Sequence, residues 1–154
     1  MESLFAALDC GTTAIKAGLL DATGRVLGLS RRECVCHHYE DGRVEQAPEC
    51  LAEEAMRALR EAVEQSGQDP GQVGAISLST QRATVIVTDR EGQALAPALS
   101  WQDMRAEAEI EAFRARIGEA DYYHLTGLPL HPVFSLGKLL LLQQRRPALF
   151  SSAG

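Results

Sequence analysis

The sequence predicts a mixed α/β fold, in which an antiparallel sheet is followed by a helix, a further strand and more helices. Short apolar segments alternate with tight turns near the start of the chain, and a longer segment after them has helical periodicity. Strand-like and helix-like segments then continue to alternate. A strand meander followed by helices and strands gives a layered α/β structure rather than a bundle or a sandwich.

Three strands are expected near the start of the chain, at Leu4–Leu8, at Ile15–Leu20 and from Val26 to about Val35. The small-residue turns DCGTT and DATG separate them, and two tight turns imply antiparallel pairing. Gly11 allows the backbone of the first turn to come close to another group.

A polar segment without periodicity, His37–Pro48, is expected to be a loop. A helix should begin at Pro48, which suits a first helical position, and should end at Gly67 in the C′ position. Its apolar residues recur at helical spacing on one face: Leu51, Ala55, Met56, Leu59, Ala62 and Val63.

The second half of the chain is expected to contain two strands and two helices. The strands are Val73–Ser79 and Ala83–Thr88, followed by a turn at residues 89–92. The first helix should run from about Asp103 to Ile117 and stop at Gly118. The last helix should present Leu136, Leu139 and Leu140 on one face and should be closed by Pro147.

Composition places the chain in the ordinary globular class. It has 154 residues, of which 45% are hydrophobic and 23% charged, which suits a single domain with a sizeable core. The net charge of −6 and the lack of a basic run argue against nucleic acid as a partner. No apolar stretch is long enough to span a membrane, and no leader pattern precedes Asp9. Four cysteines without disulfide-scaffold density favour the cytoplasm.

The first turn has the composition of a phosphate-binding site. Asp9 ends a buried strand, and Gly11, Thr12 and Thr13 follow with hydroxyls and free backbone N–H groups. Amides and hydroxyls hold phosphate oxygens, and a carboxylate can hold Mg²⁺ directly or through water. The ammonium of Lys16 is close enough in sequence to reach the same phosphates. An ordinary hairpin with an Asp and Thr turn would look the same from these residues alone.

A second group of residues suits a polyol. Gln81 and Arg82 follow one strand, and Trp101 and Asp103 come later in the motif WQDMR. Guanidinium groups hold hydroxyl oxygens, and an indole covers the carbon face of a sugar while offering one N–H donor. A core tryptophan beside a surface arginine is the alternative interpretation.

The order of motifs resembles the FGGY family of carbohydrate kinases, which includes glycerol kinase and xylulokinase. The segments that carry the resemblance are LDCGTTAIKAGLLDATGRVL, VEQAPE before a helix, ISLSTQRATVIVTDREG and PALSWQDMR. The resemblance extends from Leu4 to about Phe150, and four ordered motifs are more specific than any single one. It implies a ribonuclease H-like, actin-like ATPase fold, with residues 1–154 forming part of the N-terminal domain.

The resemblance also implies site residues and a reaction. ATP and Mg²⁺ would be used to phosphorylate a hydroxyl of a small sugar or polyol. Asp9 would belong to the Mg²⁺ site, while Gly11, Thr12, Thr13 and Lys16 would face the phosphates. The matching substrate positions are Gln81, Arg82, Trp101 and, less directly, Asp103. The family's aspartate base would lie beyond residue 154, so that this segment alone should be inactive.

Departures from the glycerol kinase pattern argue against glycerol as the substrate. Ala83 stands where those enzymes have a glutamate after Gln-Arg, and Val133 stands where they have a tyrosine after proline. Lost polar contacts would leave substrate hydroxyls unpaired. The Met-His pair of xylulokinases is also missing, so the sugar is not identified.

Cysteines and histidines give no strong metal signal. Cys34, Cys36, His37 and His38 carry metal-ligating groups, but a second pair is missing, so buried thiols and a loop histidine pair are the preferred interpretation. For His124 and His131, which flank a Thr-Gly-Leu-Pro segment, packing or surface positions are favoured over pocket positions.

Two other classes of function stay open. A non-catalytic relative could bind a sugar or nucleotide without transferring phosphate. A chaperone-type actin-like ATPase would share the first turn but would not explain the WQDMR motif. A homo-oligomer of the full-length enzyme is also left open.

Overall fold

A computed structural model describes residues 3–154, which form two compact units. Unit 1 comprises residues 3–36 and 47–81, and unit 2 comprises residues 37–46 and 82–154. Each unit is described separately below. None of the helices within residues 3–154 combines the length and the apolar character needed to cross a membrane.

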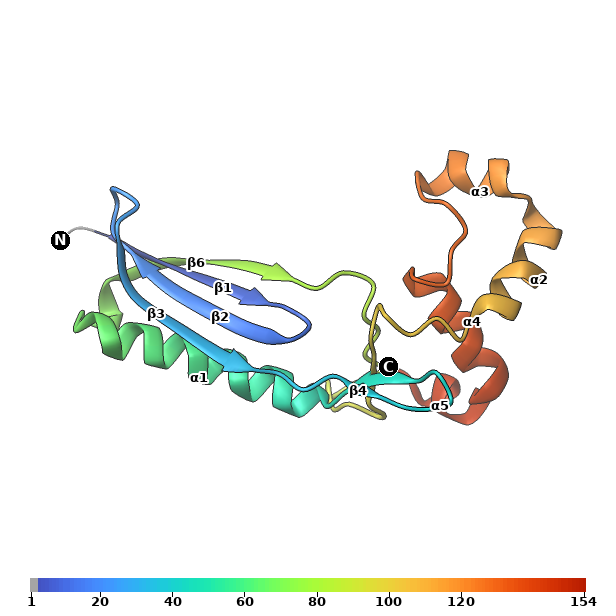
Figure 1. Cartoon of the computed structure of the whole chain (residues 1–154), viewed down its shortest axis with the longest axis horizontal. Coiled ribbons are helices and arrows are strands. Elements are labelled where there is room, and N and C mark those ends of the chain that lie inside the picture. The colour runs from blue at the N-terminus through green and yellow to red at the C-terminus, as the bar shows by residue number, and fades with distance from the viewer. Residues whose placement is uncertain (1–2) are drawn as a thin grey trace. The chain divides into compact units, whose positions relative to one another are not determined.

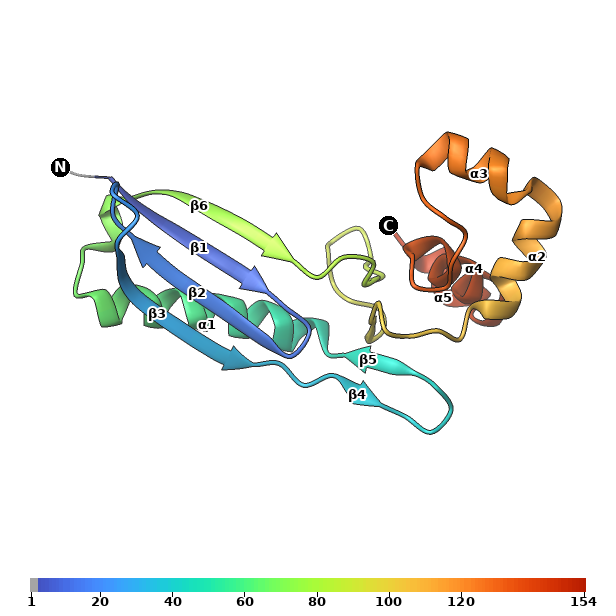
Figure 2. The ribbon, with the colours of Figure 1, turned by 45° about the horizontal axis from the view of Figure 1, so that its top comes forward.

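Unit 1 contains a four-stranded sheet with the order β3-β2-β1-β6. β1 (Leu4–Cys10) pairs antiparallel with β2 (Ala14–Leu20), which pairs antiparallel with β3 (Val26–Glu33) (Figure 2). β6 (Val73–Thr80) lies parallel to β1 on its other side. The predicted meander and the strand at Val73–Ser79 are therefore confirmed.

The helix α1 (Pro48–Ser66) lies along one face of this sheet (Figure 1). It begins at Pro48 and ends at Gly67, whose left-handed φ of 66° suits a glycine, so both predicted boundaries are confirmed. Its small residues Ala58 and Ala62 are buried against the strands. The approach is closest at Gly28 of β3, where an added Cβ would lie 2.0 Å from the carbonyl oxygen of Ala62.

Charged side chains join β3 to α1 at the edge of this core. Arg32 donates from Nε to Oε2 of Glu54 at 2.6 Å and from a terminal nitrogen to Oε1 of Glu61 at 3.0 Å. Glu54 also accepts from Arg57 at 2.7 Å. The hydrogen bond from Arg32 lowers the pKa of Glu54, and the Arg57 charge acts in the same direction. This network fixes the position of α1 along the outer strand.

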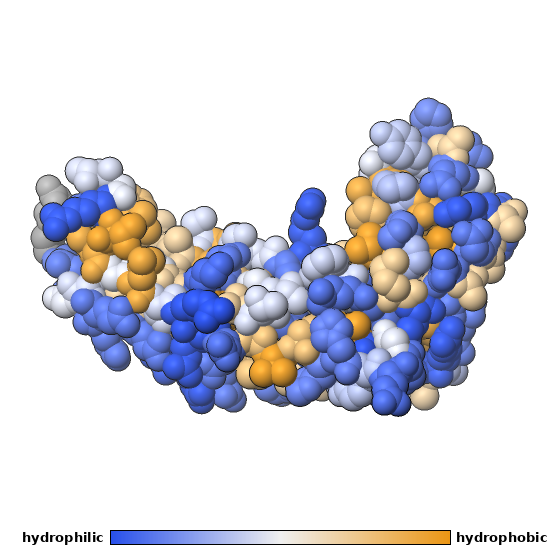
Figure 3. Space-filling model, in the orientation of Figure 1, coloured by the Kyte–Doolittle hydropathy of each residue, from blue (hydrophilic) through white to orange (hydrophobic). Residues whose placement is uncertain are grey.

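The opposite face of the unit 1 sheet carries exposed apolar side chains. Phe5 and Leu29 are 43% and 61% exposed on this face. Ile76 and Leu78 of β6 are also exposed, but they pair with Ala6 and Leu8 and therefore lie on the α1 side of the sheet, beyond the helix. Hydrophobic residues are visible at the surface on the left of Figure 3, where this unit lies. Along β1 burial alternates, so Asp9 shares this open face with Phe5 rather than the face under α1.

The first part of unit 2 corrects the prediction of a loop at His37–Pro48. The segment forms a hairpin from β4 (His37–His38) and β5 (Val44–Gln46), and β5 pairs with β7 (Ala98–Leu99). The turn closes because Gly42 adopts a φ of 84° and Tyr39 donates its N–H to the carbonyl of Arg43. Strands of two and three residues are too short to show an alternating pattern.

The predicted strand Ala83–Thr88 was also wrong. The structure has only isolated bridges there, Val85 with Leu99 and Thr88 with Ala94. Ala83 has a φ of 60°, which interrupts extended backbone at the start of the segment. The turn at residues 89–92 is confirmed by the hydrogen bond from the N–H of Gly92 to the carbonyl of Asp89.

Four helices complete unit 2. They are α2 (Glu107–Ile117), α3 (Glu119–Thr126), α4 (Ser135–Arg145) and α5 (Pro147–Ser152). The prediction found α2 and α4 but missed α3 and α5, and it placed the start of α2 at Asp103. The N–H of Arg105 binds the Asp103 side chain instead, which holds a turn before the helix.

The buried face of α4 differs from the predicted one. Leu141 and Leu142 are buried, whereas Leu139 is 40% exposed. Four consecutive leucines hide the helical period, so packing decides the face. An added Cβ at Gly137 would lie 3.1 Å from the Cβ of Ala106, which shows how closely α4 approaches the start of α2.

Candidate functional site

The β1–β2 turn in unit 1 is tight and depends on Gly11. The N–H of Gly11 donates to the carbonyl of Ala14 at 3.2 Å, and a Cβ at Gly11 would lie 2.9 Å from that oxygen. Thr13 is exposed, and its carbonyl accepts from the N–H of Cys34. The predicted phosphate turn therefore exists as a tight hairpin turn, with small side chains around its bend.

Asp9 is an accessible carboxylate at the end of β1. It lies opposite Lys16 in the antiparallel register, and Nζ of Lys16 is 3.9 Å from its Oδ2. The side chain of Asp9 is 48% exposed and that of Lys16 is 61% exposed. Water therefore screens this ion pair, and both groups can reach a ligand. A carboxylate on the open face of a sheet, next to a cation, suits a bound phosphate with its metal.

The donor set at Asp9 fits a magnesium ion only in part. Within residues 3–154, no three metal-ligating side chains of the Asp, Glu, His or Cys type gather together. Mg²⁺ is commonly held by one or two carboxylates with phosphate oxygens and waters completing the shell. Asp9 can supply such a single carboxylate, and the other ligands would come from a nucleotide and solvent.

The end of β6 meets the same turn. The N–H of Gln81 donates to the carbonyl of Cys10, and the hydroxyl of Thr12 donates to Oε1 of Gln81 at 3.0 Å. Thr12 from the predicted phosphate set thus contacts Gln81 from the predicted substrate set. The carboxyl ends of parallel strands are a common place for ligand sites in α/β proteins.

Cys10 lies between Asp9 and this turn. Burial raises the pKa of its thiol, and the nearby Asp9 carboxylate raises it further. A thiol whose pKa is raised stays protonated and is a weak nucleophile at neutral pH. Its place in the site is that of a small packing residue.

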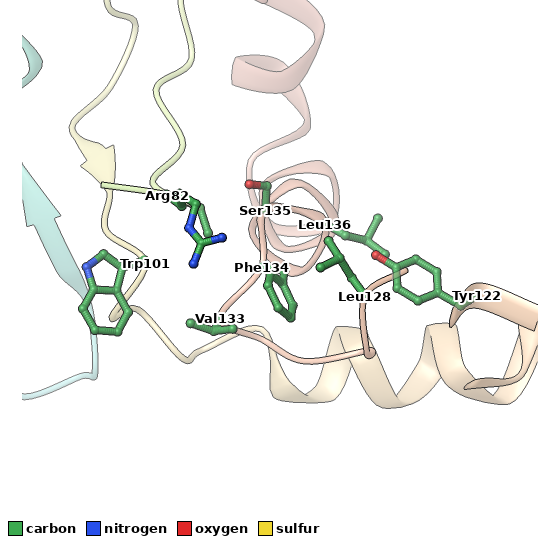
Figure 4. A pocket seen from close by; sticks show the side chains of 9 residues that line it. Arg82, Trp101, Tyr122, Leu128, Val133, Phe134, Ser135 and Leu136 are labelled. Carbon is green, nitrogen blue, oxygen red and sulfur yellow. The ribbon is translucent and has the colours of Figure 1, made fainter. Parts of the chain in front are cut away.

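Unit 2 contains a cavity of about 720 Å³ in which two of the predicted substrate residues meet. Arg82 and Trp101 both line it, together with the hydroxyl-bearing residues Tyr122 and Ser135. Figure 4 shows the Arg82 guanidinium pointing into the cavity, between the rings of Trp101 and Phe134 in this view. The size is within the usual range for small-molecule sites.

The other wall of the cavity is apolar and was largely missed by sequence reasoning. It consists of Ala83, Leu128, Val133, Phe134 and Leu136. Most of these residues come from the segment between α3 and α4 and from the first turn of α4. The glycine and prolines of this segment indicated a loop between helices, but nothing local indicated that the loop would lie opposite Arg82.

Asp103 takes a supporting position. Its side chain is 1% exposed. Its Oδ1 accepts a hydrogen bond from the backbone N–H of Arg105, and its Oδ2 accepts one from the guanidinium of Arg105 at 2.7 Å. Oδ2 also accepts from the N–H of Val44 in β5. Both oxygens are therefore used within unit 2, and Asp103 is absent from the lining of the cavity.

The cysteines and histidines at residues 34–38 do not form a group of three potential metal ligands within the described residues 3–154. Cys34 is buried and Cys36 is half-buried, and none of the four cysteines, all within residues 3–154, takes part in a disulfide. His131 accepts from the N–H of Val133 through its Nδ1, which makes it a turn-stabilising residue. Neither His131 nor His124 lines the cavity.

Lys138 supports the cavity wall from behind and was not identified from the sequence. Its side chain is 1% exposed, and Nζ donates to the carbonyl of Pro132 at 3.2 Å and to that of Val133 at 2.8 Å. Burial lowers the pKa of Lys138 to about 8, and the charge of Asp103 opposes this shift. A buried ammonium thus ties α4 to the segment that carries Val133.

We expect Lys138 to give unit 2 a pH-dependent stability. Because its pKa is lower in the folded chain than in the unfolded chain, the unfolded state binds more protons from about pH 8 to 10.5. The free energy of unfolding should therefore rise with pH across this window, and Lys138→Met should remove that rise. The measurement is urea unfolding from pH 7 to 10, followed by fluorescence of Trp101, the single tryptophan of the chain.

Tyrosines and cysteines also titrate in this pH range. Subtracting the unfolding free energies of Lys138→Met from those of the wild type at each pH removes their contribution and leaves that of Lys138. Lys16→Met is the matched control, because Lys16 is the other lysine of the chain and lies in unit 1. Parallel pH profiles for wild type and Lys138→Met would contradict the assignment.

Comparison with known proteins gives a consistent family. Residues 4–154 match the N-terminal domain of the FGGY family of carbohydrate kinases. A glycerol kinase of Thermus brockianus is 40% identical over 144 residues, which cover 93% of this chain and 29% of that protein. A glycerol kinase of Thermococcus gammatolerans is 34% identical over 99% of this chain and 31% of that protein.

Solved structures agree with these sequence matches. A gluconate kinase of Lactobacillus acidophilus has a TM-score of 0.87 at 25% identity, over 99% of this chain and 30% of that one. A xylulose kinase of Rhodospirillum rubrum has a TM-score of 0.92 at 23% identity, over 97% of this chain and 31% of that one, and this match shows the fold alone. The predicted ribonuclease H-like, actin-like ATPase fold is therefore confirmed for the part present here.

The chain spans about 30% of the length of these relatives. The match to the family domain covers residues 4–154, which include the β1–β2 turn and the residues of the Arg82 cavity. The chain therefore belongs to the FGGY family of carbohydrate kinases, and its residues 4–154 match the N-terminal domain of that family.

Proposed function

We propose that residues 1–154 are part of the N-terminal domain of an ATP-dependent kinase that transfers the γ-phosphate to a hydroxyl of a sugar or polyol. The observation that carries the proposal is the accessible Asp9 carboxylate beside the tight Gly11 turn, in a chain of this family. Kinases of this kind work mainly by positioning and by neutralising charge on the transferred group. Four cysteines without a disulfide among residues 3–154 are consistent with a cytoplasmic enzyme.

In this proposal the unit 1 site holds the nucleotide phosphates. Gly11, Thr12 and Thr13 offer backbone N–H groups and hydroxyls, and the exposed ammonium of Lys16 offers a positive charge. Asp9 would hold Mg²⁺ directly or through water. The magnesium ion would supply charge neutralisation between phosphate oxygens when it is bound.

The unit 2 cavity holds the sugar or polyol in the same proposal. Arg82 donates to oxygens, and Trp101 covers the carbon skeleton. Gln81 belongs to unit 1 and does not line this cavity, and it stays a proposed substrate residue from the family motif alone. Asp103 acts indirectly, because its carboxylate orders Arg105 and β5. Ala83 and Val133 give the cavity apolar groups where glycerol kinases have polar ones, which argues against glycerol.

The base that accepts the substrate proton is proposed to lie outside residues 1–154, since the relatives are about three times longer than the matched segment. Neither Asp9 nor Asp103 is the proposed base, because Asp9 is assigned to Mg²⁺ and Asp103 holds Arg105 and β5. Residues 1–154 alone should therefore bind ligands weakly and transfer no phosphate.

The test uses the full-length protein with radiolabelled ATP, Mg²⁺ and a panel of sugars, polyols and sugar acids. Transfer of label to at least one acceptor, at a rate well above ATP hydrolysis, is the expected result. Saturable binding of a panel member without any transfer would contradict the kinase proposal and favour a non-catalytic binding protein. ATP hydrolysis that no acceptor stimulates would favour a different actin-like ATPase.

A further inference from the structure

The end of β6 holds the β1–β2 turn from the neighbouring strand. The parallel register of β1 and β6 ends with Cys10 beside Thr80. One residue further, the backbone N–H of Gln81 donates to the carbonyl of Cys10, the last residue of β1, at 3.0 Å. Gln81 is therefore fixed directly beside the start of the turn.

The side chain of Gln81 reaches the other side of the same bend. Its Oε1 accepts a hydrogen bond from the hydroxyl of Thr12 at 3.0 Å, across 69 positions of sequence. Cys10 and Thr12 flank Gly11, so the backbone and the side chain of Gln81 hold the bend on both sides of the glycine. Thr12 and Gln81 are both half-buried, so water competes less with this hydrogen bond than with one at the surface.

The glycine in the bend is the reason why this hold matters for a ligand. A glycine loses more backbone freedom on ordering than any other residue, so a bend that depends on Gly11 is costly to order during binding. The bend itself is closed by the hydrogen bond from the N–H of Gly11 to the carbonyl of Ala14, which is 3.2 Å long. The two bonds from Gln81 keep the bend in one shape before a ligand arrives, which lowers the ordering cost of binding.

We propose that Gln81 is a positioning residue for the nucleotide, because it holds the Gly11 turn in the shape that binds the phosphates of ATP. The inference rests on the proposed kinase function and deepens it, since it gives a residue of the substrate motif a task at the phosphate turn. Loss of a substrate contact would weaken binding of the acceptor, whereas loss of this hold weakens binding of the nucleotide. A merely structural role would lower stability and leave the affinity for nucleotide unchanged.

The test is binding of a non-hydrolysable ATP analogue with Mg²⁺ to the full-length protein, measured by calorimetry without an acceptor. Gln81→Met keeps the length of the side chain but removes the oxygen that accepts from Thr12. We expect the dissociation constant of the analogue to rise about fivefold, the effect of losing one hydrogen bond of ordinary strength. Gln68→Met is the matched control, because it makes the same chemical change at an exposed position of unit 1 after α1, and it should leave the affinity unchanged.

A double-mutant cycle shows whether Gln81 acts through Thr12. Thr12→Val removes the hydroxyl while keeping a similar shape, and it should also weaken binding of the analogue. If the two residues act as a pair, adding Gln81→Met to Thr12→Val should weaken binding by less than about twofold more. In a Thr12→Ser background, which keeps a hydroxyl donor, Gln81→Met should again cost about fivefold.

Hydrogen exchange in the nucleotide-free, full-length protein measures the hold itself. The amide of Gly11 should exchange about fivefold faster in Gln81→Met than in the wild type, because its bond to Ala14 opens more readily when the bend is held on one side only. Gln68→Met should leave this exchange rate unchanged.

Unchanged affinity for the analogue in Gln81→Met would overturn the inference, as would unchanged exchange at Gly11 or fully additive losses in the cycle. Weakened binding of the acceptor alone would also overturn it, because Gln81 would then be a substrate contact only. If Gln81→Met failed to fold, Thr12→Val would test the same bond, and unchanged affinity and exchange there would count equally against it. Failure of the proposed function looks different, because the wild type would then bind no analogue and transfer no phosphate in the acceptor panel.

Discussion

Gly28→Ala should destabilise unit 1 by about 3 kcal/mol or more, the upper range for overpacking a tightly packed site. The added Cβ would lie 2.0 Å from the carbonyl oxygen of Ala62 and 3.1 Å from the N of Ser66. Both of these are backbone atoms of α1, so no side-chain rotation can relieve the overlap. The helix would have to move away from β3, which would also stretch the contacts of Arg32 with Glu54.

Urea unfolding followed by far-ultraviolet circular dichroism measures this loss, and hydrogen exchange at amides of β3 and α1 locates it. Gly74→Ala is the matched control in the same sheet, because the nearest atom to its added Cβ is the Cβ of Ser3, 3.7 Å away. That substitution should be neutral or slightly stabilising, since it restricts the unfolded chain. Equal stability of the two variants would mean that α1 does not approach β3 as closely as described.

The parts of the fold that could be predicted from the sequence are those whose signals are local. The three strands of the meander are short apolar runs bounded by turns, and α1 has a proline at its start and a glycine at its end. The hairpin of β4 and β5 could not be predicted, because its strands are too short to show a period and depend on pairing with β7. The face of α4 depends on contact with α2 at Gly137, which a run of leucines does not reveal.

The residues of the candidate site also fall into those with a local sequence signal and those without one. Asp9, Gly11, Arg82 and Trp101 lie in motifs of a few residues, so the order of those motifs along the chain is enough to indicate them. Phe134 and the other cavity residues of the α3–α4 segment become neighbours of Arg82 only through folding of unit 2.

Supporting residues were the hardest to predict. A lysine is rarely buried, so Lys138 would be expected at the surface from its type alone. Its role becomes visible only when the carbonyls of Pro132 and Val133 are placed around its ammonium. Asp103 lies in a recognisable motif, yet its contact with Val44 shows a structural task that the motif does not state.

Asp9→Asn should lower the rate of phosphate transfer by the full-length protein about 100-fold or more, the loss typical of a group that stabilises charge in a transition state. The amide keeps the shape and one acceptor oxygen of the carboxylate but lacks the charge that attracts a divalent cation. The fold should tolerate the change, because the side chain is 48% exposed and its pair with Lys16 is long and screened. The readouts are kcat/KM for the best acceptor of the panel and the midpoint of thermal unfolding.

Asp21→Asn is the matched control, since it removes the same charge from unit 1 at the other end of β2. There the Oδ1 atom accepts from the N–H groups of Thr23 and Arg25, and an asparagine oxygen can accept both bonds equally well. Loss of transfer in Asp9→Asn with normal activity in Asp21→Asn would tie the reaction to the turn rather than to net charge. Activity of Asp9→Asn within about threefold of wild type would remove Asp9 from the reaction, because a charge that neutralises a triphosphate and its metal cannot be lost at so small a cost.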